Sequence, residues 1–284
     1  MSIAVVTDST AYLPERFRGS VRIVALRVSV DGAEPVAESD FGPGELVSAL
    51  ERKSRVTTSG ASAEEFARVY REALDSGAGG VVSVHLSRQL SGTWDAARWA
   101  ADEVDPERVR VVDSRSAAMG LGFAVLAAVD RAATASEPSV VESVAQRAAD
   151  RTTTLFSVPT LEHLRRGGRI GATAAALGTA LSIKPVLHVH EGRIQALEKV
   201  RTTARALSRL REISAGAAGS GGASVAVHHL GAPDEAERLA AQLRAEVPGC
   251  EECVVSEVGA VIGAHIGPGA VGVVVLPGGW KSGL

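Results

Sequence analysis

Residues 80–112 read GVVSVHLSRQLSGTWDAARWAADEVDPERVRVV, and their pattern decides the fold. The run Gly80–His85 is short and apolar, which is typical of a buried strand. Residues 94–104 repeat their apolar side chains at helical spacing, and residues 109–112 form a second apolar run. A strand, a helix and another strand in succession predict a parallel sheet covered by helices.

The rest of the first half repeats this alternation. Ser62 and Glu65 have the spacing of a capping box, which predicts the start of a helix. The other apolar patterns predict strands at residues 3–6 and within 21–30, and helices at 44–52, 64–76, 122–135 and 139–150.

The second half mixes a hairpin with helical crossovers. A turn at Glu191 and Gly192 separates two strand-like runs, and Gly167 with Gly168 ends a short helix at 160–166. Further strands are predicted at 152–158, 224–229, 252–257 and 271–276, helices at 203–213 and 233–246, and a flexible loop at 216–222. The fold class is therefore two α/β domains, residues 1–153 with a mostly parallel sheet and residues 154–284 with a mixed sheet.

Composition excludes several classes of protein. Of 284 residues, 45% are apolar and 22% are charged, which is ordinary for a globular chain, and the net charge of −3 offers no basic field for nucleic acid. The start, MSIAVVTDST, lacks the features of a signal peptide, and the apolar run at 271–276 is too short to span a bilayer. These features predict a cytoplasmic protein without stable membrane insertion.

Two hydroxyl clusters are candidates for binding an anion. Thr57-Thr58-Ser59 and Ser91-Gly92-Thr93 are each expected at the end of a strand and beside the N-terminus of a helix. Free backbone N–H groups and the helix dipole favour an anion there. The same hydroxyls could equally be helix caps with no ligand.

A late glycine-rich segment, Gly263-Ala-His265-Ile-Gly267-Pro-Gly269, is predicted as a loop before an apolar strand. Its histidine could bind a ligand or hold the loop together. Two small basic clusters, residues 165–169 and 199–202, are either anion clamps or solvated surface.

Signals for catalysis are weak. The sequence has no G-x-S-x-G elbow and no Walker A lysine motif. Asp8 and Asp113 each follow a predicted strand, where an aspartate could bind a metal but more often caps a turn. Cys250 and Cys253 are too few for a four-ligand zinc site.

Taken together, these segments resemble the DegV family, whose better-understood members are the fatty-acid-binding (FakB-type) subunits of bacterial fatty acid kinase. The matching segments occur in family order across residues 3–275: VVTDSTAYLP, VTTSGAS, LSRQLSGTWDAA, VVDSRSAAMGLG, TLEHLRRGGRI, LSIKPVL, KVRT and VIGAHIGPGAVGV. One departure is Gly60-Ala61, where the family usually has Gln-Pro, so that loop and the ligand preference are open to change.

The resemblance implies a long-chain fatty acid in a tunnel between the two domains. It implies that the carboxylate is held by the hydroxyls of Thr58 and Ser91, with Gly92 and Thr93 completing the second motif and His265 lying close.

The resemblance also implies roles beyond the carboxylate. Ser59 and Arg169 are expected on the head-group side, and Arg201 is expected to dock a separate ATP-dependent kinase subunit that converts the carboxylate to an acyl phosphate. No cofactor, metal or catalytic residue is implied.

Two alternatives remain open at this point. One is an enzyme that acts on a small phosphorylated or carboxylated metabolite, with Asp8 or Asp113 on a metal or Ser91 as nucleophile; no base stands at a defined spacing from Ser91. The other is a lipid sensor whose output is the binding of a partner.

Overall fold

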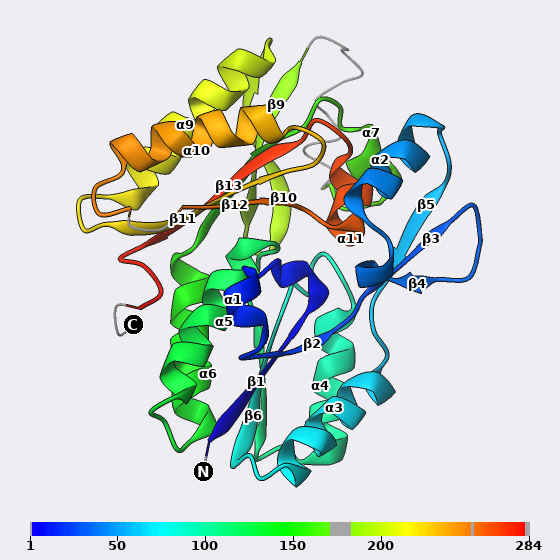
Figure 1. Ribbon diagram of the computed structural model, residues 1–284, viewed down its shortest axis with the longest axis vertical. Coiled ribbons are helices and arrows are strands. Elements are labelled where there is room, and N and C mark those ends of the chain that lie inside the picture. Colours follow the sequence, from blue (N-terminus) through cyan, green and yellow to red (C-terminus); the bar gives the residue numbers. More distant parts are fainter. Residues whose placement is uncertain (1, 171–182, 251–252, 282–284) are drawn as a thin grey trace. The chain divides into compact units, whose positions relative to one another are not determined.

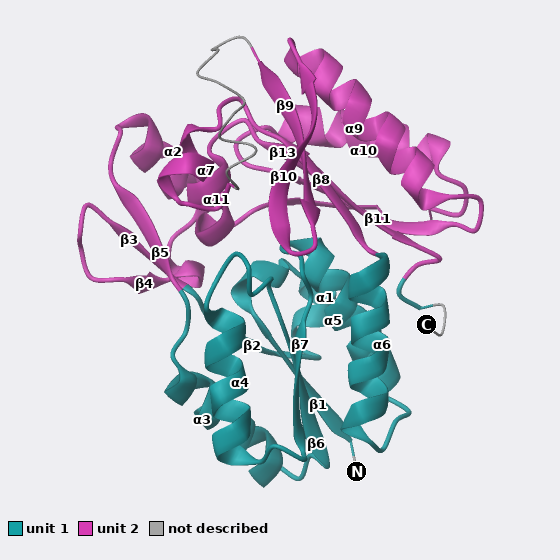
Figure 2. Cartoon of the chain, turned by 180° about the vertical axis from the view of Figure 1, so that it is seen from behind, with its two compact units in different colours: residues 1–26, 60–151, 280–284 teal, residues 27–59, 152–279 magenta. Residues whose placement is uncertain are grey.

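A computed structural model describes residues 2–170, 183–250 and 253–281. The chain forms two compact units (Figure 2). Unit 1 consists of residues 1–26, 60–151 and 280–284, and unit 2 consists of residues 27–59 and 152–279. The sequence prediction placed residues 27–59 in the first domain, whereas the contacts group this segment with the second unit.

Unit 1 contains a four-stranded parallel sheet with the order β2-β1-β6-β7. The strands are β1 (Ile3–Asp8), β2 (Arg22–Val24), β6 (Gly80–His85) and β7 (Val109–Asp113). One pair of helices covers one face and another pair covers the opposite face (Figure 2). The first pair is α3 (Ala63–Asp75) and α4 (Thr93–Val104), and the second is α5 (Met119–Ala132) and α6 (Pro138–Arg151). A 3-10 helix (Ser9–Ala11) and α1 (Glu15–Arg18) follow β1.

The local sequence explains these elements. Every residue of β6 is buried, as expected for a parallel strand with helices on both faces. At the start of α3, Ser62 Oγ accepts a hydrogen bond from the Glu65 N–H at 3.2 Å, and Glu65 Oε2 accepts one from the Ser62 N–H at 2.8 Å. The predicted capping box is confirmed.

Unit 2 is built on a six-stranded mixed sheet with the order β10-β9-β8-β13-β11-β12, in which only the β11–β12 pair is parallel among the described strands. The strands are β8 (Thr153–Ser157), β9 (Lys184–His190), β10 (Arg193–Val200), β11 (Ala223–His229), β12 (Cys253–Glu257) and β13 (Val271–Pro277). Two long helices, α9 (Thr203–Ala218) and α10 (Pro233–Glu246), pack their apolar residues against one face of this sheet (Figure 1). The predicted mixed sheet is confirmed.

The remaining part of unit 2 combines a small antiparallel sheet with short helices. The sheet has the order β4-β3-β5, with β3 at Arg27–Val30, β4 at Val36–Ala37 and β5 at Val56–Ser59. The helices are a 3-10 helix (Glu38–Asp40), α2 (Pro43–Glu51), α7 (Glu162–Arg166) and α11 (Ala260–Ile266). α11 packs against α2, α7, β3 and β5.

Long-range contacts explain why residues 27–59 belong to unit 2. The Val261 N–H of α11 donates a buried hydrogen bond of 2.9 Å to Glu38 Oε1, across 223 positions of sequence. No local pattern could indicate such a pairing.

The cluster Thr57-Thr58-Ser59 ends strand β5 as predicted, and Ser62 caps the helix that follows. Two other local predictions were wrong. His265 lies in helix α11 rather than in a loop. α9 continues to Ala218, through residues predicted as the start of a flexible loop, because the alanines of AGAA favour a helix and offset the cost of Gly216.

Candidate anion-binding site

A hydrogen bond joins two of the predicted site residues in unit 2. Thr58 Oγ1 in β5 lies 2.8 Å from His265 Nε2 in the last turn of α11. Strand alternation turns Thr58 inward while its neighbours Thr57 and Ser59 are exposed. α11 packs on β5, so the two side chains meet although 207 positions separate them.

The imidazole of His265 is electrically neutral at physiological pH. Burial lowers its pKa to about 4, and the nearby Arg169 and His163 contribute in the same direction. A neutral imidazole carries one N–H. With that proton on Nε2, His265 donates to Thr58 Oγ1, and the Thr58 hydroxyl keeps its own proton for a ligand.

The same histidine is locked in place by a glycine. A β-carbon at Gly167 would lie 2.2 Å from His265 Nδ1, so only glycine lets the ring approach this closely. A second contact has the roles of the two helices exchanged. A β-carbon at Gly267, which follows α11, would lie 2.3 Å from Cδ2 of His163 in α7. α7 and α11 thus interlock through two histidine–glycine contacts.

Thr58 and His265 line a cationic cavity of about 580 Å³ within unit 2. Arg55 and Lys53 line it from the connection between α2 and β5, Arg166 is the last residue of α7, and Arg169 follows that helix. Its other described lining residues are Leu50, Ser54, Val56, Thr57, His163, Gly167 and Ala264, so none of the residues named is acidic. The cavity therefore favours an anion.

The arginines of this cavity are held to different degrees. Arg166 is ion-paired with Glu162 on the solvent-exposed side of α7. Arg169 is half-buried and donates from Nη1 to the backbone oxygen of Gly167, beside the locked imidazole. Arg169 thus lines the same cavity as Thr58 and His265, and its role on the head-group side stays a prediction.

The second hydroxyl cluster lies in unit 1, at the start of α4. Ser91 Oγ is 2.9 Å from Thr93 Oγ1 and accepts a hydrogen bond of 3.3 Å from the Thr93 N–H. Gly92 is the N-cap residue, and Thr93 is buried. A β-carbon at Gly60 would lie 2.9 Å from Thr93 Oγ1, so the departure at Gly60 from the family pattern brings the backbone close to this motif.

Ser91 is half-buried and directly precedes Gly92, the N-cap residue of α4. The structure groups Ser91, Gly92 and Thr93 in unit 1 and Thr58, His265 and Arg169 in unit 2. That all of them reach one carboxylate stays a prediction.

Arg201 lies between β10 and α9 and is exposed. Its neighbour Thr202 caps α9, because its hydroxyl accepts a hydrogen bond of 3.2 Å from the Arg205 N–H. Among the described residues, no hydrogen bond or ion pair engages the Arg201 side chain.

The aspartates that an enzyme could use for a metal have structural roles. Asp113 accepts hydrogen bonds from the N–H groups of Arg115 at 2.8 Å and Arg88 at 3.4 Å. Asp8 is fully buried and accepts from Thr10, from the Leu86 N–H at 3.0 Å, and from His85 Nδ1 at 3.0 Å. Across the three described stretches, no group of three or more potential metal ligands occurs.

A buried chain of hydrogen bonds continues from Asp8, and sequence reasoning did not find it. His85 Nε2 is 2.7 Å from Ser83 Oγ, which accepts from the Tyr70 hydroxyl at 2.9 Å. The order serine, histidine, aspartate matches a hydrolase triad, but all of these side chains are fully buried and Tyr70 occupies the serine. This series of hydrogen bonds is therefore part of the core. Its only signal in the sequence is the spacing of Ser83 and His85, which places both side chains on one face of a strand.

The two cysteines are unsuited to thiolate chemistry. Burial raises the pKa of the Cys250 thiol, and burial together with Cys250 raises that of Cys253 to about 12. Both thiols are therefore protonated at neutral pH. No helix among the described residues is long and apolar enough to cross a membrane.

Comparisons with known proteins cover nearly the whole chain. The DegV family, described as uncharacterised proteins, matches residues 2–278. A DegV domain-containing protein of Streptomyces coelicolor is 49% identical over 275 residues, covering 96% of this chain and 98% of the relative. A Mycobacterium bovis relative is 41% identical over 278 residues, covering 97% of each.

Solved structures share the fold. A fatty-acid-binding DegV family protein from Thermus thermophilus superimposes with a TM-score of 0.90 at 38% identity, covering 98% of this chain and all of that one. DegV of Bacillus subtilis, described as a fatty acid binding protein, gives a TM-score of 0.87 at 33% identity, covering 97% and 99%.

Proposed function

The chain belongs to the DegV family, and from that premise we propose that it binds a long-chain fatty acid and presents the carboxylate to a separate kinase subunit. The kinase converts the carboxylate to an acyl phosphate, and the chain itself performs no chemistry. The fatty acid binding of the Thermus thermophilus and Bacillus subtilis relatives supports the first part of this proposal.

The observation that carries the proposal is the Thr58–His265 pair in a cationic cavity. Burying an unpaired carboxylate costs at least several kcal/mol, so a carboxylate site needs several donors. Thr58 supplies a hydroxyl that is free to donate to the ligand when the neutral His265 carries its proton on Nε2, and Arg169 supplies positive charge nearby. We assign Ser91, with Gly92 and Thr93, as the second donor group.

The tail makes the larger contribution to affinity. Each buried methylene contributes about 0.8 kcal/mol, so a long chain outweighs the cost of ordering it. The head-group contacts then set the orientation of the ligand and contribute the smaller share of the affinity. This division of roles fits a carrier that must hold one class of ligand and expose its reactive end.

Mass spectrometry tests the ligand class. We expect protein purified without added ligand to release a long-chain fatty acid in near-equimolar amount after denaturation. Release of a phosphorylated metabolite instead, with no fatty acid bound or taken up on addition, would contradict the proposal.

Arg201 tests the kinase part separately. Because Arg201 is exposed, its replacement in Arg201→Ala should leave fatty acid affinity within about twofold, well below the tenfold that 1.4 kcal/mol represents. It should lower acyl-phosphate formation with a cognate kinase, and high salt should narrow the gap between variant and wild type. Arg193→Ala, an exposed arginine at the other end of β10, is the matched control. Parallel loss of binding and turnover would instead place Arg201 at the ligand.

A further inference from the structure

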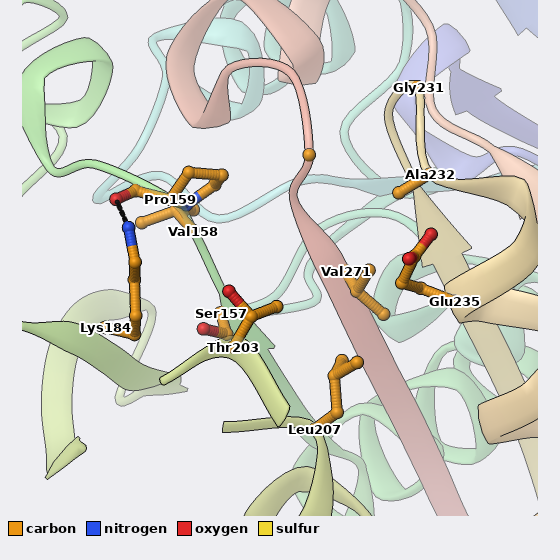
Figure 3. Close-up of a pocket in the computed structure, with 11 residues that line it drawn as sticks. Ser157, Val158, Pro159, Lys184, Thr203, Leu207, Gly231, Ala232, Glu235 and Val271 are labelled. Carbon is orange, nitrogen blue, oxygen red and sulfur yellow. Dashed lines mark hydrogen bonds between the residues drawn. The ribbon is translucent and has the colours of Figure 1, made fainter. Parts of the chain in front are cut away.

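A second cavity of unit 2, of about 300 Å³, lies where β8 ends and where α9 and α10 begin (Figure 3). It shares no lining residue with the Thr58 cavity. Its described lining residues are Ser157, Val158, Pro159, Lys184, Thr203, Leu207, Gly231, Ala232, Glu235, Gly269 and Val271. We propose that this cavity is a binding site for a small aliphatic carboxylate, independent of the fatty acid site.

The first observation is a hydroxyl that faces the cavity and has no partner in the described part of the chain. Ser157, the last residue of β8, is only 8% exposed and lines the cavity. Among the described residues, no hydrogen bond engages its side chain. Its Oγ is not one of the fully buried unpaired atoms of the described residues, so this hydroxyl is accessible from the cavity. A ligand oxygen in the cavity would supply the missing partner.

The second observation is a lysine without an acidic partner. Lys184 begins β9, and its Nζ donates to the Pro159 backbone oxygen at 2.9 Å (Figure 3). No carboxylate lies within ion-pair distance of it in the described part of the chain. Since an ammonium has three N–H groups, two remain for a ligand.

The helices add to the positive field. α9 has 16 residues and α10 has 14, and both begin at this cavity. The N-cap residue of α10, Ala232, offers no side chain to cap the first turn. Thr203, in the first turn of α9, adds a hydroxyl. These features favour an anion beside Lys184.

Glu235 selects the kind of anion. Its carboxylate lines the cavity on the side opposite Lys184 in Figure 3 and pairs with Arg238 at 3.2 Å. A doubly charged phosphate would be repelled by Glu235, whereas a single carboxylate next to Lys184 would not need to approach it. Val271 and Leu207 provide an apolar wall for a short aliphatic chain. The volume is at the small end for ligand pockets, which fits a molecule of a few carbons.

Titration of the isolated full-length chain with butyrate and with inorganic phosphate, followed by calorimetry or NMR, tests the proposal. We expect saturable butyrate binding and weaker phosphate binding. Lys184→Met and Ser157→Ala should each weaken butyrate by about 10- to 150-fold, the value of one charge-assisted hydrogen bond. Lys184→Arg should retain binding.

Lys199→Met, a lysine-to-methionine change outside the cavity, is the control. Circular dichroism must show that Lys184→Met is folded, and Ser157→Ala serves if it is not. The proposal fails if butyrate does not saturate, or if Lys184→Met and Ser157→Ala bind it like wild type. It also fails if Thr58→Val abolishes butyrate binding, because butyrate would then occupy the first cavity.

Discussion

The ring of His265 lies against the backbone of Gly167 so closely that a β-carbon at position 167 would lie 2.2 Å from Nδ1. This contact fixes the direction in which Nε2 faces Thr58. The position of the His265 ring in the candidate site therefore depends on contact with the backbone of Gly167. The geometry of the site depends on the absence of a side chain at position 167.

Alanine variants of the neighbouring Gly167 and Gly168 distinguish the effect of side-chain packing from the effect of backbone strain. Gly167→Ala should displace His265 and weaken fatty acid binding at least tenfold, about 1.4 kcal/mol. Gly168→Ala meets open space, but φ is +68° there, so it should cost about 1 kcal/mol of stability with little change in affinity. Affinity and urea unfolding of both variants decide this. Equal affinities for the two would show that the imidazole contact does not matter for binding.

The Thr58 hydroxyl is expected to donate directly to the ligand. Thr58→Val keeps the shape of the side chain and removes this donor, so fatty acid affinity should fall by about 10- to 150-fold. Thr153→Val is the matched control, since Thr153 is a half-buried strand residue of the same unit. Calorimetric titration measures both variants, and unchanged affinity in Thr58→Val would remove this hydroxyl from the site.

Stability should fall as pH is lowered from about 6.5 to about 4. Burial lowers the pKa of both His265 and His228 to about 4, so the unfolded chain binds their protons first. Their stabilising contribution is complete above about pH 6.5 and is lost as pH falls towards the folded-state values, by at most about 1.4 kcal/mol per pH unit for each histidine.

His265→Gln isolates one of these two protons. Glutamine does not titrate, so the slope of unfolding free energy against pH should be shallower in the variant between about pH 6.5 and 4. Urea unfolding at several pH values measures the slope. Identical slopes for wild type and variant would contradict a buried neutral His265.

The buried Asp8 is expected to hold the core of unit 1 together. Asp8→Ala leaves His85 and the Leu86 N–H without their acceptor and should destabilise the chain by about 3–5 kcal/mol. Asp113→Ala, at an aspartate that ends strand β7 of the same sheet, should cost only about 0.5–1.5 kcal/mol. Urea denaturation compares them. A similar loss for both would mean that Asp8 is no more than a turn residue.

The sequence was sufficient for the strands of the two larger sheets because their signals are local. Apolar runs such as Gly80–His85 and the Ser62–Glu65 capping box depend on neighbours in the chain, and both appear as expected. The Thr58–His265 bond joins residues 207 positions apart, and no periodic pattern reports such a distance. Family resemblance, rather than composition or spacing, brought these two residues together in the prediction.

Helix α11 shows where local reasoning fails. Gly263 and Gly267 predict a loop, yet Gly263 lies inside the helix. A β-carbon at position 263 would lie 2.4 Å from a Leu46 methyl, which explains why this helical position is a glycine. Tertiary packing thus requires glycine where propensity disfavours it. His265, which was predicted in a loop, lies in the same helix.

The discontinuous make-up of unit 2 has a consequence for biosynthesis. Residues 27–59 leave the ribosome early, but Glu38 bonds to Val261, and β5 packs on α11 near the end of the chain. At about 5–20 residues per second, this segment waits roughly 10–40 s for its partners. During that interval its apolar side chains have no native neighbours, so nascent chains are expected to need protection by a chaperone, and a message truncated before α11 would release a product that cannot complete unit 2.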